Sequence, residues 1–399
     1  MNKAILKAAI YFSVAATFTA TAISCNNDDN STPTTPSSID PNNFQGKISS
    51  GTTETLDPAK VYKLTGKFLV ESGATLIIPA GTRVTANEGD TYLIVDRGGK
   101  IMINGTAANP VTFEGTAHKQ GHWGGIVILG NAPSNRSASG TSSSELGDMI
   151  YGGTNKTDNS GSISYLIIKD SGFKYSPEKE FNGLSLFGVG SGTQISNVYV
   201  TDGADDGIEC FGGNVNLNNI MITGVGDDGF DWTEGYQGNV TNLYVARKKQ
   251  YQNAGEPGNR GIEADTNDPD NNTTFGNGVS NPSISNATFL GNTAGAESQG
   301  LKIRAGSNGK FDNILIANYS TGLDFETDRT YNWFTGENYL KNIRFVNVGT
   351  HVKTKDTTPN PIQFTENAGA NGAGSGTALP DWAKGWTGLQ NFDVSDSMN

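Results

Sequence analysis

The sequence predicts an all-β fold, a right-handed, single-stranded parallel β-helix built as a solenoid of roughly 22-residue coils. Two observations carry this prediction. Two short apolar phrases alternate along the chain at near-constant spacing, and 52 glycines provide turns between them, whereas few segments have the period of an amphipathic helix. Each repeat of strand, turn, second strand and return forms one coil, and successive coils stack ~4.8 Å apart.

The first phrase has the pattern apolar-x-Asn-apolar-x-apolar. Its third position is occupied in turn by Tyr165, Asn197, Asn219, Asn242, Asn286, Asn313 and Asn342. Equivalent residues of stacked coils lie one above another. We therefore expect the asparagine side chains to form a structural ladder of hydrogen bonds at a bend of the chain.

The second phrase has the pattern Gly-apolar-x-apolar. It begins at Gly125, Gly183, Gly207, Gly229, Gly261, Gly300 and Gly322. Side chains alternate across a strand, so this phrase predicts that Cys210 and Trp232 point into the core while Glu209 and Asp231 point outward. Cys210 is then a buried apolar residue and not a nucleophile.

Both ends of the chain are predicted to lie outside the solenoid. Residues 1–24 form a lipoprotein signal peptide, because lysines precede a short apolar run that ends in the letters AIS before Cys25. This ending resembles the lipobox of bacterial lipoproteins and implies a mature protein that begins at a lipidated Cys25. The remaining boundaries are a flexible tether over 25–43, the β-helix over 44–378 and a C-terminal cap segment over 379–399.

Charge and cysteine content exclude several classes of protein. The formal net charge of −12 repels nucleic acid, so we expect no nucleic-acid partner. Apart from Cys25 the only cysteine is Cys210, so the sequence allows no intramolecular disulfide and no thiolate zinc site.

An acidic phrase occurs twice in the middle coils, as "GADDGIE" and "GDDGFD". Stacked carboxylates ~4.8 Å apart repel by ~1 kcal/mol in water and ~3–4 kcal/mol at an effective dielectric near 20. Three explanations remain open. The first is plain turn chemistry, in which Asp-Gly makes the turn and water solvates the charge. The second is a calcium site held by Asp206, Glu209, Asp228 and Asp231.

The third explanation is catalysis by Asp205, Asp206, Asp227 and Asp228. The letters "TDGADDGIE" resemble the Asp-rich motifs of polygalacturonase-type glycoside hydrolases, in which carboxyl groups protonate the leaving oxygen and activate water. The chain lacks the Gly-His-Gly motif of those enzymes, and "LKIRAG" matches their Arg-Ile-Lys element only approximately.

A basic insertion between Asn242 and Gly261 leaves the solenoid at the same turn as the acidic pairs. Insertions in solenoids gather on the functional face. The insertion therefore either neutralises the acidic turns or contacts a ligand beside them. The candidate ligand-binding residues are Glu209, Asp231, Arg247, Lys248, Lys249, Tyr251 and Arg260.

The late coils place charges of both signs on the outward side of their strands. The two predicted columns are Glu263, Lys302 and Asp324, and Asp265, Arg304 and Glu326. We expect a solvent-exposed, salt-bridged face here, in which neutralising Lys302 or Asp324 changes stability by only ~0–1 kcal/mol.

Several phrases resemble a family of Bacteroidota β-helix surface lipoproteins of undefined function. They include "ESGATLIIPAGT", "GTAANPVTFEG", "WGGIVILGNAP", "NGLSLFGVGSGT" and "LPDWAKGWTG", and together they cover nearly the whole mature chain. The acidic letters "CNNDDN" after the signal peptide are similar to the export tag of such lipoproteins. The resemblance implies a pectin-lyase-like β-helix, an outer-membrane lipid anchor and a TonB-dependent transporter as partner, but no reaction.

The leading hypothesis is therefore a non-enzymatic, surface-exposed outer-membrane lipoprotein whose β-helix binds a glycan or another extracellular nutrient. One alternative is a polysaccharide-degrading β-helix enzyme, a glycoside hydrolase or lyase. The other is a structural or adhesive surface protein. Calcium is the only cofactor that the sequence suggests.

Overall fold

The computed structural model describes most of the chain from residue 37 onward. The described ranges are 37–144, 146, 149–176, 179–248, 260–267, 278–293, 298–354 and 361–392. The predicted signal peptide, Cys25, Lys249 and Tyr251 lie outside the described residues.

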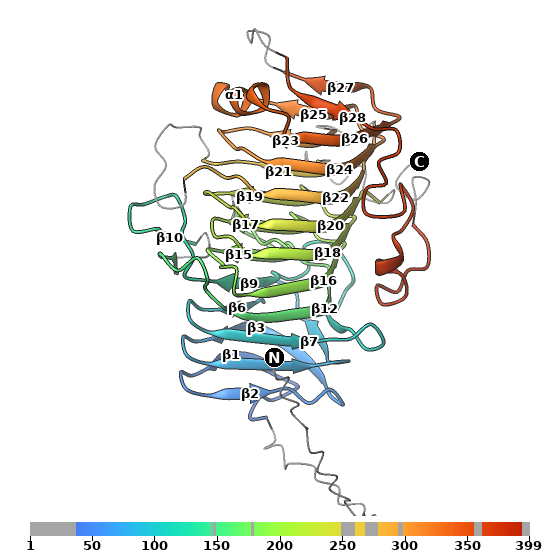
Figure 1. Ribbon diagram of the computed structural model, residues 1–399. Helices are drawn as coiled ribbons and strands as arrows, with labels where there is room; N and C mark the ends of the chain where they lie inside the picture. The colour runs from blue at the N-terminus through green and yellow to red at the C-terminus, as the bar shows by residue number, and fades with distance from the viewer. Residues whose placement is uncertain are drawn as a thin grey trace, which may run out of the picture. The chain divides into compact units, whose positions relative to one another are not determined.

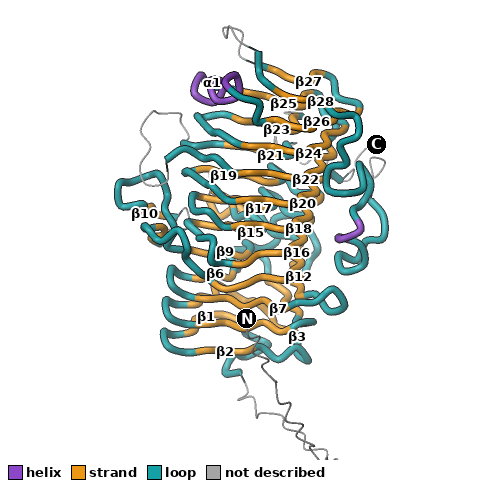
Figure 2. Tube along the Cα trace, viewed as in Figure 1, coloured by secondary structure: helices purple, strands orange, loops and turns teal. Residues whose placement is uncertain are grey.

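The described chain forms a right-handed parallel β-helix, which confirms the predicted fold class. Coils stack along one axis from the N-terminal to the C-terminal end (Figure 1). Every strand of the main 24-stranded sheet pairs in parallel with strands one coil away, and loops make most of the connections (Figure 2). The strands group into three lateral faces, which we call faces A, B and C.

Face A contains four short separate strands and the first halves of longer ones. They are β2 (Thr53–Thr55), β4 (Thr75–Pro79), β7 (Lys100–Asn104), β12 (Gly161–Lys169), β16 (Gln194–Thr201), β18 (Asn216–Thr223), β20 (Asn239–Ala246), β22 (Ser283–Leu290), β24 (Lys310–Ala317), β26 (Leu340–Val346) and β28 (Phe364–Glu366). Face B contains the second halves of β12, β16, β18, β20, β22, β24 and β26, together with β5 (Arg83–Ala86) and β8 (Val111–Gly115).

Face C contains the strands of the glycine phrase. They are β6 (Leu93–Val95), β9 (Ile126–Leu129), β15 (Leu184–Phe187), β17 (Ile208–Phe211), β19 (Phe230–Thr233), β21 (Ile262–Ala264), β23 (Gln299–Ile303), β25 (Thr321–Phe325) and β27 (Thr350–Lys353). In the first coils β3 (Val61–Val70) runs through faces B and C and pairs with β1 (Phe44–Ile48).

Few elements lie outside the three faces. Two short hairpins project from the solenoid, β10 (Thr141–Ser143) with β11 (Ile150–Gly152), and β13 (Lys174–Ser176) with β14 (Lys179–Glu180). The described residues contain one α-helix, α1 (Asp328–Gly336), and one short 3-10 helix, η2 (Asp381–Ala383). No helix among them is long and apolar enough to cross a bilayer.

The core runs along the axis and consists of the inward side chains of all three faces. Cys210 and Trp232 are fully buried in it, as the alternation predicts, and Cys210 is a free thiol. The hydrogen bond from Trp232 Nε1 to Ser307 Oγ, 3.0 Å long, satisfies the one polar atom of that ring.

The asparagine ladder is confirmed from Asn197 to Asn313, whereas Asn342 donates to Oδ1 of Asp312 over 2.7 Å and not to Asn313. The Nδ2 atom of Asn219 donates to Oδ1 of Asn197 over 3.0 Å, and Asn242 donates to Asn219 over 2.8 Å. Asn286 and Asn313 continue the series. Each of the five asparagines of the ladder has a positive φ of 54–60°, so the bend between faces A and B needs a left-handed residue, which asparagine tolerates better than most.

The predicted tether, residues 25–43, extends too far at its C-terminal end. The described chain already contacts the first coils at residue 37, because Ser37 Oγ donates to Oε2 of Glu54 over 2.9 Å and the amide of Ser38 donates to the same oxygen. Residues 37–43 therefore belong to the folded body.

The C-terminal segment folds back along face B, although we predicted a cap. Outward apolar side chains of face B, among them Tyr199, Met221 and Leu315, form a cluster with Trp386 and Phe392. A lateral face that carries such side chains needs cover from water, and the chain after β28 provides it.

Candidate functional site

The repeated acidic phrase lies at the turn from face B into face C. Each Asp-Asp pair is followed by a glycine, because a Cβ atom at Gly207 would lie 2.4 Å from Ile222 and one at Gly229 would lie 2.3 Å from Val245. The close packing of the turn on face B therefore explains the glycines. It does not explain the acidic residues.

The strands after these turns align the outward carboxylates. Glu209 of β17 pairs in register with Asp231 of β19, and Asp231 pairs with Glu263 of β21. Parallel strand pairing therefore places three carboxylates on the outer side of face C in successive coils. The turns add Asp206 and Asp228 beside them.

Carboxylate oxygens of these residues converge into three overlapping groups, in each of which the oxygens lie within 4.8 Å of one another. The groups are Asp205 with Asp206 and Asp227, Asp206 with Glu209 and Asp231, and Asp228 with Asp231 and Glu263. We call these seven residues the acidic cluster. All four predicted metal ligands belong to it.

Burial makes the acidic cluster unusual. Asp206 and Asp228 are buried, whereas Asp205, Glu209, Asp227 and Asp231 are partly exposed. The amide of Asp228 donates to Oδ1 of Asp206 over 2.8 Å. In contrast, the buried Oδ1 atoms of Asp228 and Asp231 have no hydrogen-bond partner among the described residues. A buried oxygen without a partner is costly, so these two atoms are candidate ligands for a cation.

The environment shifts the acidity of three members. Desolvation raises the pKa of Asp206, Asp228 and Asp231 well above the ordinary aspartate value, and neighbouring carboxylates raise it further. The Arg260 guanidinium opposes the rise at Asp228. Ionisation of these three carboxyl groups therefore has a high electrostatic cost.

The residues of the basic insertion have separate roles. Arg260 Nη1 lies 3.2 Å from Asp228 Oδ2 and 2.7 Å from Glu263 Oε1, so it neutralises part of the acidic cluster. Lys248 Nζ lies 2.9 Å from Asp202 Oδ1. Arg247 is buried and donates to the carbonyl oxygens of Val225 and Asp227, so it fixes the acidic turn and is not a surface contact for a ligand. The predicted residues Lys249 and Tyr251 lie outside the described part.

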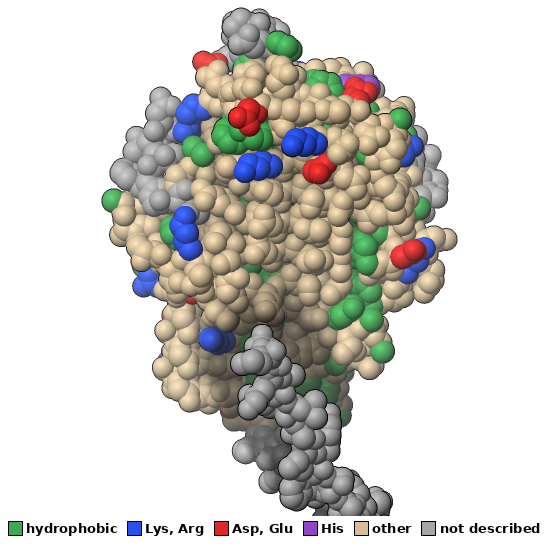
Figure 3. Space-filling view, viewed as in Figure 1, with side chains coloured by type: hydrophobic (Ala, Val, Ile, Leu, Met, Phe, Trp, Pro, Cys, Tyr) green, Lys and Arg blue, Asp and Glu red, His purple; other side chains and the backbone are tan. Residues whose placement is uncertain are grey.

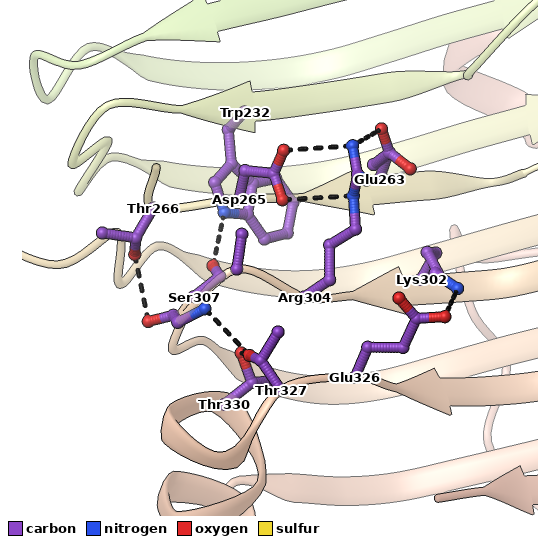
Figure 4. A network of polar contacts seen from close by, with 12 residues as sticks. Trp232, Glu263, Asp265, Thr266, Lys302, Arg304, Ser307, Glu326, Thr327 and Thr330 are labelled. Carbon is purple, nitrogen blue, oxygen red and sulfur yellow. Dashed lines mark hydrogen bonds and ion pairs between the residues drawn. The ribbon is translucent and has the colours of Figure 1, made fainter. Parts of the chain in front are cut away.

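The salt-bridged columns of the late coils exist, but Glu263, Asp265, Lys302 and Asp324 are buried and not exposed as predicted, whereas Arg304 and Glu326 are partly exposed. Arg304 contacts Glu263 over 2.9 Å and Asp265 over 3.3 Å, as Figure 4 shows. Asp324 is 1% exposed and lies 3.5 Å from Lys302 and 3.1 Å from Lys353. Side chains from the two neighbouring coils cover this carboxylate, so the expected cost of ~0–1 kcal/mol for an exposed pair does not apply to Lys302 and Asp324.

Two residues of the site were not among the sequence-based candidates. Glu263 joins Asp228 and Asp231 in one group, although we assigned it to the salt-bridged columns. Its position one coil after Asp231 was a signal in the sequence. Asn182 Nδ2 donates to Glu209 Oε2 over 2.7 Å from a turn 27 residues earlier, for which the sequence carried no signal.

The raised pKa values predict a pH dependence of stability. Asp206 and Asp228 bind protons more tightly in the folded than in the unfolded state, so their contribution to stability is complete below the ordinary aspartate pKa near ~4 and is lost as the pH rises through the folded-state values. In calcium-free buffer, unfolding free energy should fall more steeply with rising pH in the native protein than in Asp206→Asn with Asp228→Asn. The difference is at most ~1.4 kcal/mol per pH unit and group. Equal slopes in urea unfolding from pH 4 to 8 would contradict the assignment.

The chemistry of the acidic cluster fits a hard divalent cation. Calcium takes six to eight oxygen ligands at ~2.3–2.6 Å in flexible geometry, and carboxylates from adjacent coils are suitable ligands. Asp228 and Asp231, whose Oδ1 atoms have no hydrogen-bond partner among the described residues, share one group with Glu263. This group is therefore the best candidate for the cation site. The arrangement also permits catalysis, because a carboxyl group of raised pKa can transfer a proton to a bound substrate.

Comparison with known proteins places the fold in a family. A model of the pectate-lyase-like β-helix domain matches residues 46–387. Neither the curated proteins nor the solved structures gave a match. The resemblance to Bacteroidota surface lipoproteins stays a prediction. Because the match spans most of the chain, this protein belongs to the pectate-lyase-like β-helix family.

Proposed function

We propose that this chain is a surface-exposed outer-membrane lipoprotein that binds an extracellular glycan or another nutrient on face C, with calcium held by the acidic cluster. Family membership is consistent with a carbohydrate-related or surface protein. The observation that carries the proposal is the convergence of carboxylates from successive coils around buried oxygens that have no partner among the described residues.

The balance of charge supports a bound cation. Seven carboxylates form the acidic cluster, and the guanidiniums that approach it within the described part of the chain include Arg260, Arg304 and the buried Arg247. At an effective dielectric near 20, one pair of carboxylates ~5 Å apart costs ~3 kcal/mol. A divalent cation between them removes this repulsion and satisfies the oxygens of Asp228 and Asp231 at once.

The partial exposure of the acidic cluster supports a role in binding beyond a structural metal. Asp205, Glu209, Asp227 and Asp231 are partly exposed, while Asp206 and Asp228 are buried. The buried members fix the cation, and the exposed edge leaves coordination positions for oxygens from outside. Hydroxyl and carboxylate groups of a glycan are oxygen ligands of the kind that calcium prefers.

A glycan array tests the binding function. We expect the purified protein without its signal peptide to retain at least one glycan in calcium and to lose it in chelator. The variant Asp206→Asn with Asp228→Asn should lose the same glycan in both buffers. Retention of no glycan under either condition would favour a structural or adhesive protein, and the lack of any glycan whose retention requires calcium would overturn the role of the acidic cluster.

The lipid anchor is the part of the proposal that rests on the sequence alone. Cys25→Ala should release the protein from the membrane fraction or stall its processing, because the acylated sulfur is the attachment point. External protease should degrade the native protein on intact cells. Protection from protease in intact cells, with degradation after lysis, would show that the protein faces inward. A TonB-dependent transporter is the partner that we propose for such a lipoprotein.

A polysaccharide-degrading enzyme is the second candidate, and one observation favours it. A carboxyl group whose pKa is raised stays protonated closer to neutral pH, as a general acid requires, and the pKa values of Asp206, Asp228 and Asp231 are raised. An enzyme should release new reducing ends or unsaturated products from a bound polysaccharide. Asp228→Asn should then abolish product formation while glycan binding persists.

A further inference from the structure

A separate pocket lies on face A at the late coils, away from the strands of face C that carry the acidic cluster. Its volume is about 380 Å³, and its lining comes from β22, β24, β26 and the turn after α1. The volume falls in the range of small-ligand pockets, ~300–1,000 Å³. All residues that line it are described residues.

Outward side chains of three successive coils form the floor of this pocket. Ser285 pairs in register with Asp312, and Asp312 pairs with Lys341. Lys310, one outward position before Asp312, also lines it. The floor thus presents a hydroxyl, a carboxylate and two ammonium groups on strands of a rigid solenoid.

An aromatic ring in a fixed orientation forms one wall. Tyr339 stacks on Trp333 of α1 with ring centroids 4.2 Å apart and an interplanar angle of 8°. The Nε1 atom of Trp333 donates to the carbonyl oxygen of Gly309 over 3.1 Å, which anchors the pair to the solenoid. A preorganised aromatic face loses little conformational entropy when a ligand binds.

The surroundings of the pocket differ from the rest of this side of the molecule. Outward residues of face A on β12, β16, β18 and β20 are uncharged and polar, among them Ser196, Asn218 and Thr241. Figure 3, seen from the same side as Figure 1, shows acidic and basic side chains gathered beside a hydrophobic patch in the upper part of this view, whereas most of the surface below is uncharged.

From these features we infer that the pocket is a saccharide-binding site. A sugar ring has an apolar face of C–H groups that fits the Tyr339 ring and a rim of hydroxyls that suits the donors and acceptors of Asp312, Lys310 and Lys341. The net charge of −12 disfavours a nucleic acid, whose bases also stack on aromatic rings. The inference rests on carbohydrate binding as proposed above but not on the cation.

The test uses the chain without its signal peptide, in chelator, titrated by calorimetry with soluble hexasaccharides of glucose, xylose, mannose and galactose. At least one hexasaccharide should bind. Tyr339→Ala should weaken its binding by about tenfold or more, which corresponds to ~1.4 kcal/mol. Tyr339→Phe, which keeps the ring, should weaken it by less than about threefold. Lys341→Met should weaken binding without a change in Tm.

Three outcomes would overturn the inference. They are no binding of any hexasaccharide, binding that Tyr339→Ala and Lys341→Met leave unchanged, and binding that Asp206→Asn with Asp228→Asn abolishes. The last outcome places the saccharide on the acidic cluster. Failure of the cation site has a different signature, because it removes the response to calcium and leaves chelator-resistant saccharide binding intact.

Discussion

Replacing Lys302 by methionine is expected to lower the free energy of unfolding by ~3–5 kcal/mol, the usual cost of removing one partner of a buried ion pair. The Lys302 side chain is 10% exposed, and its ammonium contacts Asp324 and Glu326. Without it, the carboxylate of Asp324 stays buried with less compensation, since one of its oxygens has no hydrogen-bond partner among the described residues. Urea unfolding followed by circular dichroism measures the loss.

Lys353 provides a matched control for this prediction. It contacts the same carboxylate of Asp324, but its side chain is 56% exposed. Lys353→Met should therefore cost clearly less than Lys302→Met, because water screens the half-exposed ammonium of Lys353. If both lysine variants lose the same small amount of stability, the late coils are a solvated face after all.

Calcium is expected to stabilise the native protein by a free energy that grows with its concentration and reaches ~2.7 kcal/mol at a hundred times the Kd. A ligand that binds only the folded state has this effect. Asp206→Asn with Asp228→Asn should abolish the shift in Tm, because the double substitution removes a carboxylate from each of the three oxygen groups. The side-chain amide introduced at position 206 keeps an oxygen to accept the Asp228 backbone N–H, so the fold should persist.

The control for this prediction changes the same net charge at exposed positions. Glu88 and Asp381 have side chains that are 61% and 89% exposed. Glu88→Gln with Asp381→Asn should keep the full response to calcium. A response that is reduced equally in both double variants would show that calcium acts through general screening of the acidic protein.

The fold was predictable because a solenoid repeats its signal in every coil. The glycine phrase indicated which side chains point inward, and Cys210 and Trp232 are buried as expected. The asparagine ladder was predictable from its period, although the need for a positive φ at each bend was visible only in the structure.

Burial of the outward columns could not be predicted from alternation. Alternation predicts that the Asp324 side chain points away from the core. Lys302, Gln299 and Lys353 from neighbouring strands cover it nevertheless. The same limit applies to the acidic cluster, where Asn182 contacts Glu209. The pocket beside Tyr339 depends on the stacking of Trp333, which an insertion after β25 brings back to face A.

Direct calcium binding tests the central claim. Equilibrium dialysis of the native protein, without its signal peptide, against calcium at physiological ionic strength should reveal a saturable site. Asp206→Asn with Asp228→Asn should lose that site, and Glu88→Gln with Asp381→Asn should retain it. Native protein that binds no calcium above the level of the Asp206→Asn, Asp228→Asn variant would contradict the account, and the repeated acidic phrase would then be only the chemistry of a turn.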